Sequence, residues 1–398
     1  MATLFQSWRI ILTTALSLIG LLLSLWIVLP APVESLLFLS VGAPEVSPWL
    51  IGVNAIALLL ILFRKRTTLS LILIGCGTLA LLLSSLPLLQ LSSTHQAAEA
   101  AMQKGLGPQY LNTLASPQKD LFRSRPFVLM DALRGIPRPT VRQQSVPFAQ
   151  PDGIPLNLEI FQPEAPGLYP GIVAIYGGAW RRGSPLANLE FNRYIAAQGY
   201  VVWAVDYRHA PKHRFPEQLQ DIQTALAFLQ NHAAEYDTDP QRLVLMGRSA
   251  GAHLAMLAAY STPQLAIRGV VNYYGPVDLT EGYLYPPVPD PINSRAVLTD
   301  FLGGSPNQLA EQYRQASPIT YVTQPLPPTL LIYGRRDHIV QAKYGKQLYQ
   351  ALKATQSQAV YIEIPWADHA FDAVFNGVSN QLALYYTERF IAWALHPS

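Results

Sequence analysis

Three long apolar stretches near the amino terminus constrain what this chain can fold into more than any other feature. They cover residues 10–29, 46–63 and 69–91, and none of them contains a charged side chain. An α-helix needs about 20 apolar residues to cross the ~30 Å hydrocarbon core of a bilayer. A signal peptide is the alternative for the first stretch, but its apolar core would be about 7–15 residues long, and a small-residue cleavage site would follow it. No such site follows cleanly, so the pattern predicts a membrane anchor of three transmembrane helices within residues 1–91.

The basic residues around these stretches predict their orientation. Arg64-Lys65-Arg66 lies between the second and third stretches, Arg9 precedes the first, and residues 30–48 contain no Lys or Arg. Because short basic loops stay in the cytoplasm, we expect the amino terminus and the Arg-Lys-Arg loop on the cytoplasmic side. A third crossing then places the rest of this multi-pass integral membrane protein on the extracytoplasmic side, with the lipid bilayer as a partner.

Composition argues against several kinds of site, partner and function. The single cysteine, Cys76, can form no intrachain disulfide and no cysteine-based metal site. A net charge of +3 over 398 residues gives no reason to expect a nucleic-acid partner. A transporter or channel would need polar or charged residues inside its membrane segments. These segments are almost purely apolar, which favours anchoring.

Beyond the membrane segments the chain changes character twice. Residues 92–142 are more polar, and we expect a connector that spaces the following domain from the bilayer, with short helices near 95–104 and 126–133. Residues 143–398 begin with two strand-like runs around Pro151-Asp152-Gly153, which is typical of an antiparallel hairpin. Short apolar runs then alternate with helical patterns, which predicts an α/β fold with a doubly wound, mostly parallel sheet. Residues 275–327 break the alternation and are expected to form an insertion over the carboxyl ends of the strands.

One strand-to-helix turn in this region carries a reactive residue type. Gly247-Arg248-Ser249-Ala250-Gly251 follows an apolar run and precedes a helix start rich in small residues. This pattern is typical of a nucleophile elbow, in which a strained turn exposes a serine hydroxyl. A serine that merely caps the helix is the alternative. A catalytic serine also needs a base to accept its proton and a carboxylate to orient that base.

Two later loops offer these partners. His369 follows the last strand-like run, and Asp337 follows the run before it, so both are expected at the carboxyl edge of the sheet above Ser249. Asp368 would have to fold back onto its own neighbour, which orients an imidazole poorly. The sequence therefore predicts a catalytic triad of Ser249, Asp337 and His369, in the chain order expected for this arrangement.

The remaining site residues are predicted from the loop after residue 175 and from nearby aromatic residues. Gly177 and Gly178 leave backbone N–H groups uncovered, so Gly178 and Ala179 are expected to bind an oxyanion together with the N–H of Ala250. Four aromatic residues are candidates for a substrate pocket, although core packing is the alternative for each of them: Trp180, Tyr207, Tyr274 and Phe371.

Taken together, the motifs from residue 146 to 397 resemble the α/β-hydrolase superfamily, in its esterase/lipase branch with hormone-sensitive-lipase-like and feruloyl-esterase-like enzymes. The resemblance rests on residues 176–180, 205–211, 247–251, 316–319, 334–337 and 368–369. It implies a serine hydrolase that cleaves carboxylic esters through an acyl-enzyme intermediate, without a metal or an organic cofactor.

Two residues depart from the family pattern, and several alternatives stay open. Tyr176 stands where the family usually has histidine, and Arg248 replaces the commoner His or Asp, which could alter the preference for substrate charge. An amidase or deacetylase would use the same triad. A non-catalytic binding protein of this fold is expected to lack a triad member, and none is missing. The substrate is expected to be a small-molecule or lipid-like ester, and the oligomeric state stays open.

Overall fold

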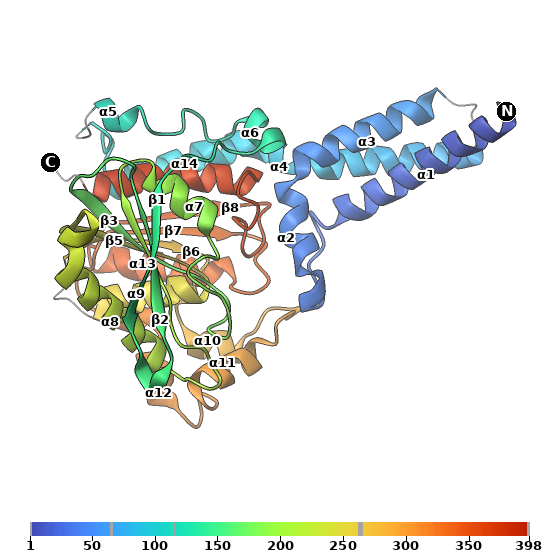
Figure 1. The fold of residues 1–398 in the computed structure, drawn as a ribbon. Coiled ribbons are helices and arrows are strands. Elements are labelled where there is room, and N and C mark those ends of the chain that lie inside the picture. The colour runs from blue at the N-terminus through green and yellow to red at the C-terminus, as the bar shows by residue number, and fades with distance from the viewer. Residues whose placement is uncertain (1, 64–66, 113, 115, 262–265, 396–398) are drawn as a thin grey trace.

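The structure is a computed structural model that describes residues 2–63, 67–112, 114, 116–261 and 266–395. An α/β domain forms one part of the molecule, and a bundle of helices from the amino-terminal region projects from it (Figure 1). The basic residues 64–66, on which the predicted orientation rests, lie outside the described residues.

An eight-stranded sheet forms the centre of the α/β domain, with the order β1-β2-β4-β3-β5-β6-β7-β8. The first two strands form the predicted antiparallel hairpin, β2 runs antiparallel to β4, and the other neighbours are parallel. The prediction of a mostly parallel sheet is therefore confirmed. The strands are β1 (Arg142–Ala149), β2 (Leu156–Gln162), β3 (Tyr169–Ile175), β4 (Val201–Val205), β5 (Thr238–Arg248), β6 (Ile267–Tyr273), β7 (Thr329–Gly334) and β8 (Ala359–Ile364).

Helices cover both faces of the sheet, so its central strands are buried almost without interruption. One face carries α8 (Glu217–His232), α9 (Ala250–Ser261) and α13 (Ala342–Ala354), and the other carries α7 (Leu189–Ala196) and α14 (Val378–Leu395). Between β6 and β7 the predicted insertion contains α10 (Leu279–Leu284), α11 (Ser294–Leu302) and α12 (Ala310–Gln315). Shorter helices precede the domain: α5 (Ser116–Lys119) and α6 (Leu129–Arg134).

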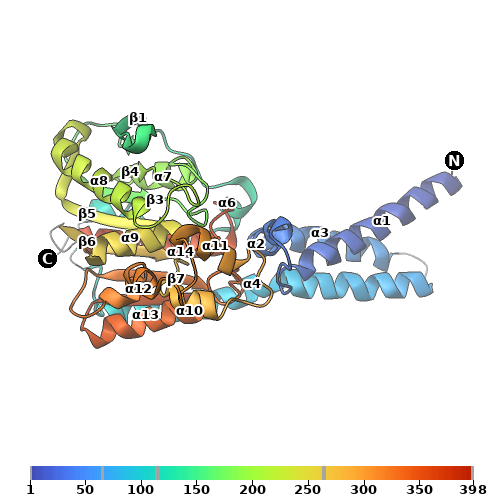
Figure 2. The same ribbon diagram turned by 90° about the horizontal axis from the view of Figure 1, so that it is seen from below.

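The amino-terminal bundle consists of α1 (Ala2–Leu25), α3 (Ser47–Leu62) and the first part of α4 (Thr68–Leu106), which lie side by side in both views (Figures 1 and 2). Its interior holds a polar contact, in which the Asn54 amide donates to the hydroxyls of Ser24 at 2.9 Å and Ser84 at 3.3 Å. Its exterior exposes large apolar side chains from all three helices, such as Ile19, Ile56 and Leu82. This distribution suits a lipid environment, where polar side chains join helices from within.

Only part of the predicted anchor meets the requirements for a membrane span. Among the described residues, α4 is long and apolar enough to cross a bilayer. The helix α2 (Leu37–Glu45) and α3 make a second candidate if the pair, which bends by 79°, counts as one broken span. The first predicted stretch contributes the shorter apolar helix Ile11–Leu25. The expectation of three spans is thus confirmed only as a membrane-like helical region with one or two candidate spans.

Helix α4 does not end with its apolar stretch. It has 39 residues, about 58 Å at 1.5 Å per residue, and its last turns pack against β8 and α14. Ala98, Met102 and Leu106 repeat every four residues and join the core of the α/β domain. We expected residues 92–106 to belong to a spacing connector, but they form a continuous helix that packs on the sheet. The reason is that burying this stripe of apolar side chains against the core lowers the free energy relative to leaving it in water.

Candidate active site

The chain turns sharply between β5 and α9, and Ser249 lies at the tip of that turn. Its φ of +52° is in the left-handed region, which costs a non-glycine residue free energy. A Cβ on Gly247 would come within 2.3 Å of the backbone of Gly251, and one on Gly251 within 2.2 Å of the carbonyl oxygen of Ile175. The two glycines are needed because three backbone segments meet at the elbow.

The structure brings the three predicted triad side chains into a hydrogen-bonded row. The Oγ of Ser249 lies 2.9 Å from Nε2 of His369, and Nδ1 of His369 lies 2.8 Å from Oδ2 of Asp337. With the proton assigned to Nδ1, the imidazole donates to the carboxylate and accepts from the serine hydroxyl. This is the arrangement in which a base can take the proton of the serine and a carboxylate holds that base in position.

Both carboxylate oxygens of Asp337 accept hydrogen bonds. Oδ2 faces His369, while Oδ1 accepts from the backbone N–H groups of Ile339 at 2.8 Å and Val340 at 2.7 Å. Burial raises the pKa of Asp337, an effect that the nearby imidazole of His369 opposes. Asp368 does not contact the imidazole of His369. It accepts from the backbone N–H of His369 instead and pairs with His338.

Other histidines near the elbow have partners that leave no role as a base. Nε2 of His253 lies 2.7 Å from the carbonyl oxygen of Ala316, and its Nδ1 accepts from the indole of Trp180 at 3.2 Å. Burial lowers the pKa of His253 to about 4, so its ring is neutral near pH 7. Nε2 of His209 lies 2.9 Å from the hydroxyl of Tyr176.

The loop after β3 brings backbone N–H groups next to Ser249. Gly178 and Ala179 both have positive φ, at 131° and 55°, which turns the loop over the elbow. Within the described residues, the N–H groups of Gly178, Ala179 and Ala250 donate no hydrogen bond. They are therefore available to an oxyanion, and their role as its donors stays a prediction.

Tyr176, at the start of this loop, is fixed by contacts with the segment that follows β4. Its hydroxyl donates to Asp206 at 2.7 Å, and its ring stacks on Tyr207 with centroids 4.5 Å apart. The hydroxyl of Tyr207 in turn donates to the carbonyl oxygen of Tyr176 at 3.1 Å. A tyrosine thus provides support at the position where the family usually has histidine.

Arg248 is buried and neutralised, so it does not present a positive charge to a substrate as the sequence suggested it could. Its guanidinium forms an ion pair with Asp372, and both side chains are only 4% exposed. It also lies 4.3 Å from the ring centroid of Phe191. Asp372 further accepts from the hydroxyl of Tyr274, whose ring centroid is 4.6 Å from that of His369. The ion pair therefore joins the elbow to the loop that carries His369, a link that sequence spacing alone does not reveal.

We expect Asp372→Ala to lower the free energy of unfolding by about 3–5 kcal/mol, because it leaves the Arg248 guanidinium buried without a counter-charge. The double replacement Arg248→Met with Asp372→Leu removes both charges and should regain most of that stability. Urea unfolding of the detergent-solubilised full chain measures both. Equal destabilisation by the single and the double replacement would contradict the ion-pair interpretation.

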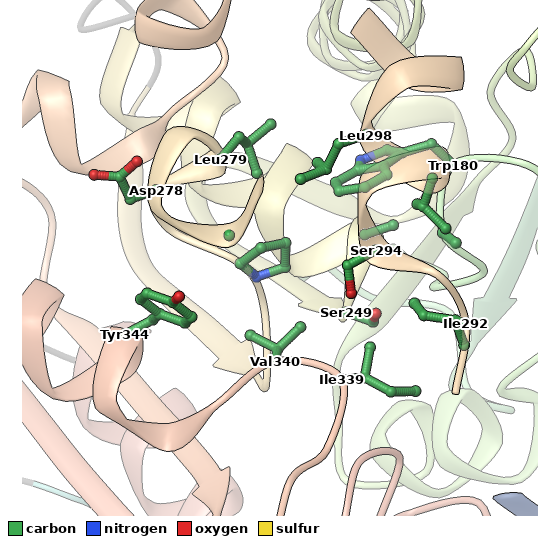
Figure 3. A pocket seen from close by; sticks show the side chains of 15 residues that line it. Trp180, Ser249, Asp278, Leu279, Ile292, Ser294, Leu298, Ile339, Val340 and Tyr344 are labelled. Carbon is green, nitrogen blue, oxygen red and sulfur yellow. The ribbon is translucent and has the colours of Figure 1, made fainter. Parts of the chain in front are cut away.

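Two cavities meet at Ser249. The smaller, of about 60 Å³, lies under the insertion, where apolar side chains surround the serine (Figure 3). Ile292, Ile339 and Val340 contribute to its wall, and none of them was predicted from the sequence. The larger, of about 470 Å³, is lined by His369, Tyr274 and Gly178, and by residues of α2.

The predicted substrate residues divide between cavity and core. Trp180 lines the smaller cavity and Tyr274 lines the larger one. Among the described residues, Tyr207 and Phe371 line neither cavity and are at most 1% exposed, so their prediction as pocket residues was wrong. The ring of Tyr207 stacks on Tyr176, and the ring of Phe371 packs on Tyr273, so both rings are covered by other aromatic side chains of the core.

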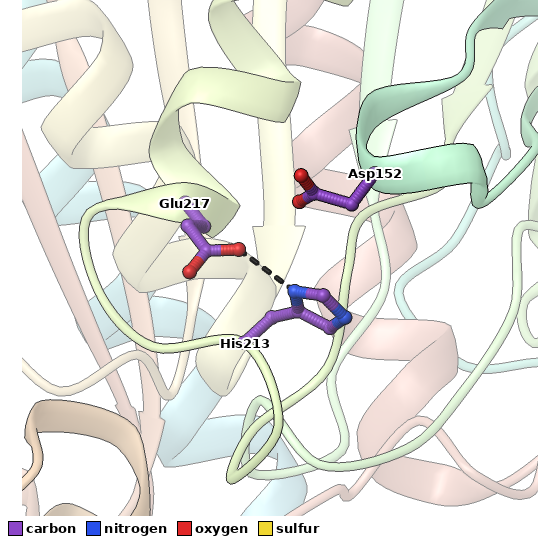
Figure 4. A group of neighbouring side chains, drawn as sticks. All are labelled: Asp152, His213 and Glu217. Carbon is purple, nitrogen blue, oxygen red and sulfur yellow. Dashed lines mark hydrogen bonds and ion pairs between the residues drawn. The ribbon is translucent and has the colours of Figure 1, made fainter.

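One group of side chains away from the elbow has the composition of a cation site. Asp152, His213 and Glu217 have ligand-type atoms within 4.8 Å of one another (Figure 4). The guanidinium of Arg208 already bonds the carboxylates of Asp152 at 2.7 Å and Glu217 at 2.8 Å. A positive charge is thus in place between the carboxylates, and the donor set does not suit a second cation.

Comparison with known proteins finds similarity to esterases. Residues 158–352 match the sequence model of the BD-FAE family. The chain is 33% identical to esterase LipC of Mycobacterium tuberculosis over 222 residues, covering 51% of this chain and 53% of LipC. It is 28% identical to esterase LipQ of the same bacterium over 325 residues, covering 74% and 75%. A bacterial heroin esterase has the same fold, with a TM-score of 0.58 and 22% identity over 66% of this chain and 87% of that protein.

The chain spans about half the length of LipC and of LipM, a further relative from that bacterium. The similarity to the heroin esterase concerns the fold.

Proposed function

We propose that this chain, whose globular part belongs to the esterase branch of the α/β-hydrolase superfamily, is a membrane-anchored serine hydrolase of carboxylic esters. The observation that carries the proposal is the row Ser249–His369–Asp337 at a strained elbow, beside N–H groups without partners. A serine that only caps a helix would need neither the imidazole nor the carboxylate.

In the first half of the reaction, the Oγ of Ser249 bonds to the ester carbonyl carbon while its proton moves to Nε2 of His369. Asp337 stabilises the resulting imidazolium, and the N–H groups of Gly178, Ala179 and Ala250 bind the oxyanion. The bond between the acyl carbon and the alcohol oxygen then breaks, and His369 returns the proton to that oxygen.

In the second half, water replaces the alcohol. His369 takes a proton from the water as its oxygen bonds to the acyl carbon, and a second oxyanion forms in the same place. The bond to Oγ of Ser249 breaks, the proton returns from His369 to the serine, and the carboxylic acid leaves. The proton transfers between Ser249 and His369 join two groups that already lie within hydrogen-bond distance.

One comparison of hydrolysis rates distinguishes an esterase from an amidase. We expect the full chain in detergent to hydrolyse p-nitrophenyl acetate at least about 100-fold faster, in kcat/KM, than p-nitroacetanilide, because an anilide needs more assistance at its leaving nitrogen. Release of p-nitrophenol and p-nitroaniline measures the two rates. A faster anilide reaction would favour the amidase alternative.

The membrane part of the proposal is that residues 10–29, 46–63 and 69–91 cross the bilayer three times. The apolar exterior of the bundle and the polar contact at Asn54 in its interior support this arrangement. The lack of Lys and Arg in residues 30–48, against the basic cluster at 64–66, supports an extracytoplasmic α/β domain.

Cysteine accessibility tests this topology. On a Cys76→Ser background, Ser92→Cys should react with a membrane-impermeant maleimide in intact cells, and Thr67→Cys should not. Both positions are exposed on the protein surface, so the membrane alone decides the outcome. Labelling at Thr67→Cys but not at Ser92→Cys would place the α/β domain in the cytoplasm.

A further inference from the structure

The amino-terminal helices contribute directly to the space around Ser249. Leu37, Phe38 and Val41 of α2 line the larger cavity, opposite Tyr274 and His369. Phe38 is 68% exposed, whereas Leu37 and Val41 are half-buried. The membrane anchor therefore forms one wall of the proposed active site.

This wall is held in place by polar contacts with the α/β domain. Glu45, at the end of α2, is 2% exposed and accepts from the backbone N–H of Ser379 at 2.8 Å. At the other end, Glu34 forms an ion pair with Arg182, which also lines the cavity. The buried contact of Glu45 fixes the carboxyl end of α2, whereas the ion pair of Glu34, just before α2, is solvent-exposed and adds little.

The chemistry assigns one part of an ester to each cavity. The leaving alcohol oxygen must receive its proton from Nε2 of His369. Ser249 lines both cavities, whereas His369 is among the lining residues of the larger one and not of the smaller one. The alcohol part of the ester therefore lies in the larger cavity, against α2, and the acyl part lies in the smaller.

Size limits the acyl part. The smaller cavity measures about 60 Å³, against about 470 Å³ for the larger. A cavity of about 150 Å³ holds one benzene ring, so only a few heavy atoms of the acyl part fit in the smaller one. Its wall is mostly apolar, with Leu279, Leu298 and Val340 among its side chains. It suits a short alkyl chain and has no room for a fatty acyl chain.

The position of α2 connects the larger cavity with the bilayer. Helix α2 lies across the axis of the bundle, between the bundle and the α/β domain (Figures 1 and 2). The segment Glu34–Glu45, which contains α2, is bent by 79° relative to α3. With α3 spanning the bilayer, α2 lies near the plane of the membrane surface. Leu129 and Met130 of α6, which contacts α3, are 50% and 46% exposed at the same junction. Exposed apolar side chains next to a membrane-spanning bundle suit contact with lipid.

We propose that the substrate is an ester of a short acyl group, of about two to four carbons, with a large apolar alcohol that resides in the bilayer. The alcohol part reaches Ser249 along α2, and the acid product is small and water-soluble. This inference rests on the proposed ester hydrolysis and specifies its substrate class.

Two esters with opposite distributions of chain length test the inference on the full chain in phosphatidylcholine vesicles. Hexadecyl acetate carries the long chain on the alcohol, and p-nitrophenyl palmitate carries it on the acid. We expect kcat/KM for hexadecyl acetate to be at least about 10-fold higher, although its leaving group is poorer, because each methylene that finds no space costs binding free energy. A higher value for the palmitate ester would overturn the inference. Failure to hydrolyse even p-nitrophenyl acetate would instead contradict the proposed function.

A pair of variants tests the role of α2. Val41→Trp should lower the ratio of hexadecyl acetate to p-nitrophenyl acetate turnover by about 10-fold, because the indole fills space that the long alcohol needs. Phe63→Trp is the matched control, because Phe63 lies at the other end of α3 and is 83% exposed. An unchanged ratio in Val41→Trp, or an equal fall in both variants, would show that the alcohol does not pass along α2.

Discussion

Ser249→Ala should abolish labelling of the full chain by a fluorophosphonate probe and lower the hydrolysis of p-nitrophenyl acetate by about 10⁴-fold or more. The probe reacts with a serine only where a base increases its nucleophilicity, and the hydroxyl of Ser249 lies 2.9 Å from Nε2 of His369. The residual rate would come from the oxyanion-binding N–H groups and from substrate binding alone.

Ser294→Ala provides the control for this prediction. Ser294 lines the smaller cavity beside Ser249, but its hydroxyl donates to Asp290 at 2.9 Å. Within the part of the chain that the structure describes, no imidazole is hydrogen-bonded to it. This variant should keep its label. Undiminished labelling of Ser249→Ala would identify another serine as the reactive one and contradict the assignment.

His369→Ala should have an effect of similar size, about 10⁴-fold on kcat/KM for p-nitrophenyl acetate. Without the imidazole, the proton of Ser249 has no acceptor, and the leaving alcohol has no donor. The hydrolysis rate and the rate of fluorophosphonate labelling should fall together, because both depend on the nucleophilicity of the serine.

Two other histidines serve as comparisons. His209 bonds Tyr176, and His253 lies between Trp180 and the carbonyl oxygen of Ala316, so neither contacts Ser249 through its ring. Their replacement by alanine should cost far less activity than His369→Ala, although His253→Ala should also lower the unfolding temperature because it leaves a buried cavity. Near-normal turnover by His369→Ala would mean that another group acts as the base.

The sequence alone was sufficient to predict the elements that follow from short-range patterns. The buried parallel strands were predicted from apolar runs, the hairpin from Pro151-Asp152-Gly153, and the elbow from the spacing of Gly247 and Gly251. Ser249, Asp337 and His369 were singled out because each follows a strand, and the carboxyl ends of parallel strands meet at one edge of a sheet.

Such short-range patterns do not predict contacts between segments that are far apart in the sequence. Nothing near Arg248 in the sequence indicates that Asp372 neutralises it. In the sequence, Tyr207 and Phe371 are as plausible as pocket residues as Trp180 and Tyr274, because all four are aromatic residues close to the predicted site. Whether an aromatic side chain lines a cavity or fills the core depends on what packs over it.

What the sequence determined by itself is therefore the presence of apolar membrane-type helices, the order of strands and helices, and the three residues of the proposed triad. Only the tertiary structure decided that α4 continues into the core of the α/β domain and that α2 forms a wall beside Ser249. The physical reason is that periodicity and turn residues act over a few positions of the chain. The burial of Glu45 beside Ser379 joins residues that are 334 positions apart, and depends on the packing of the whole molecule.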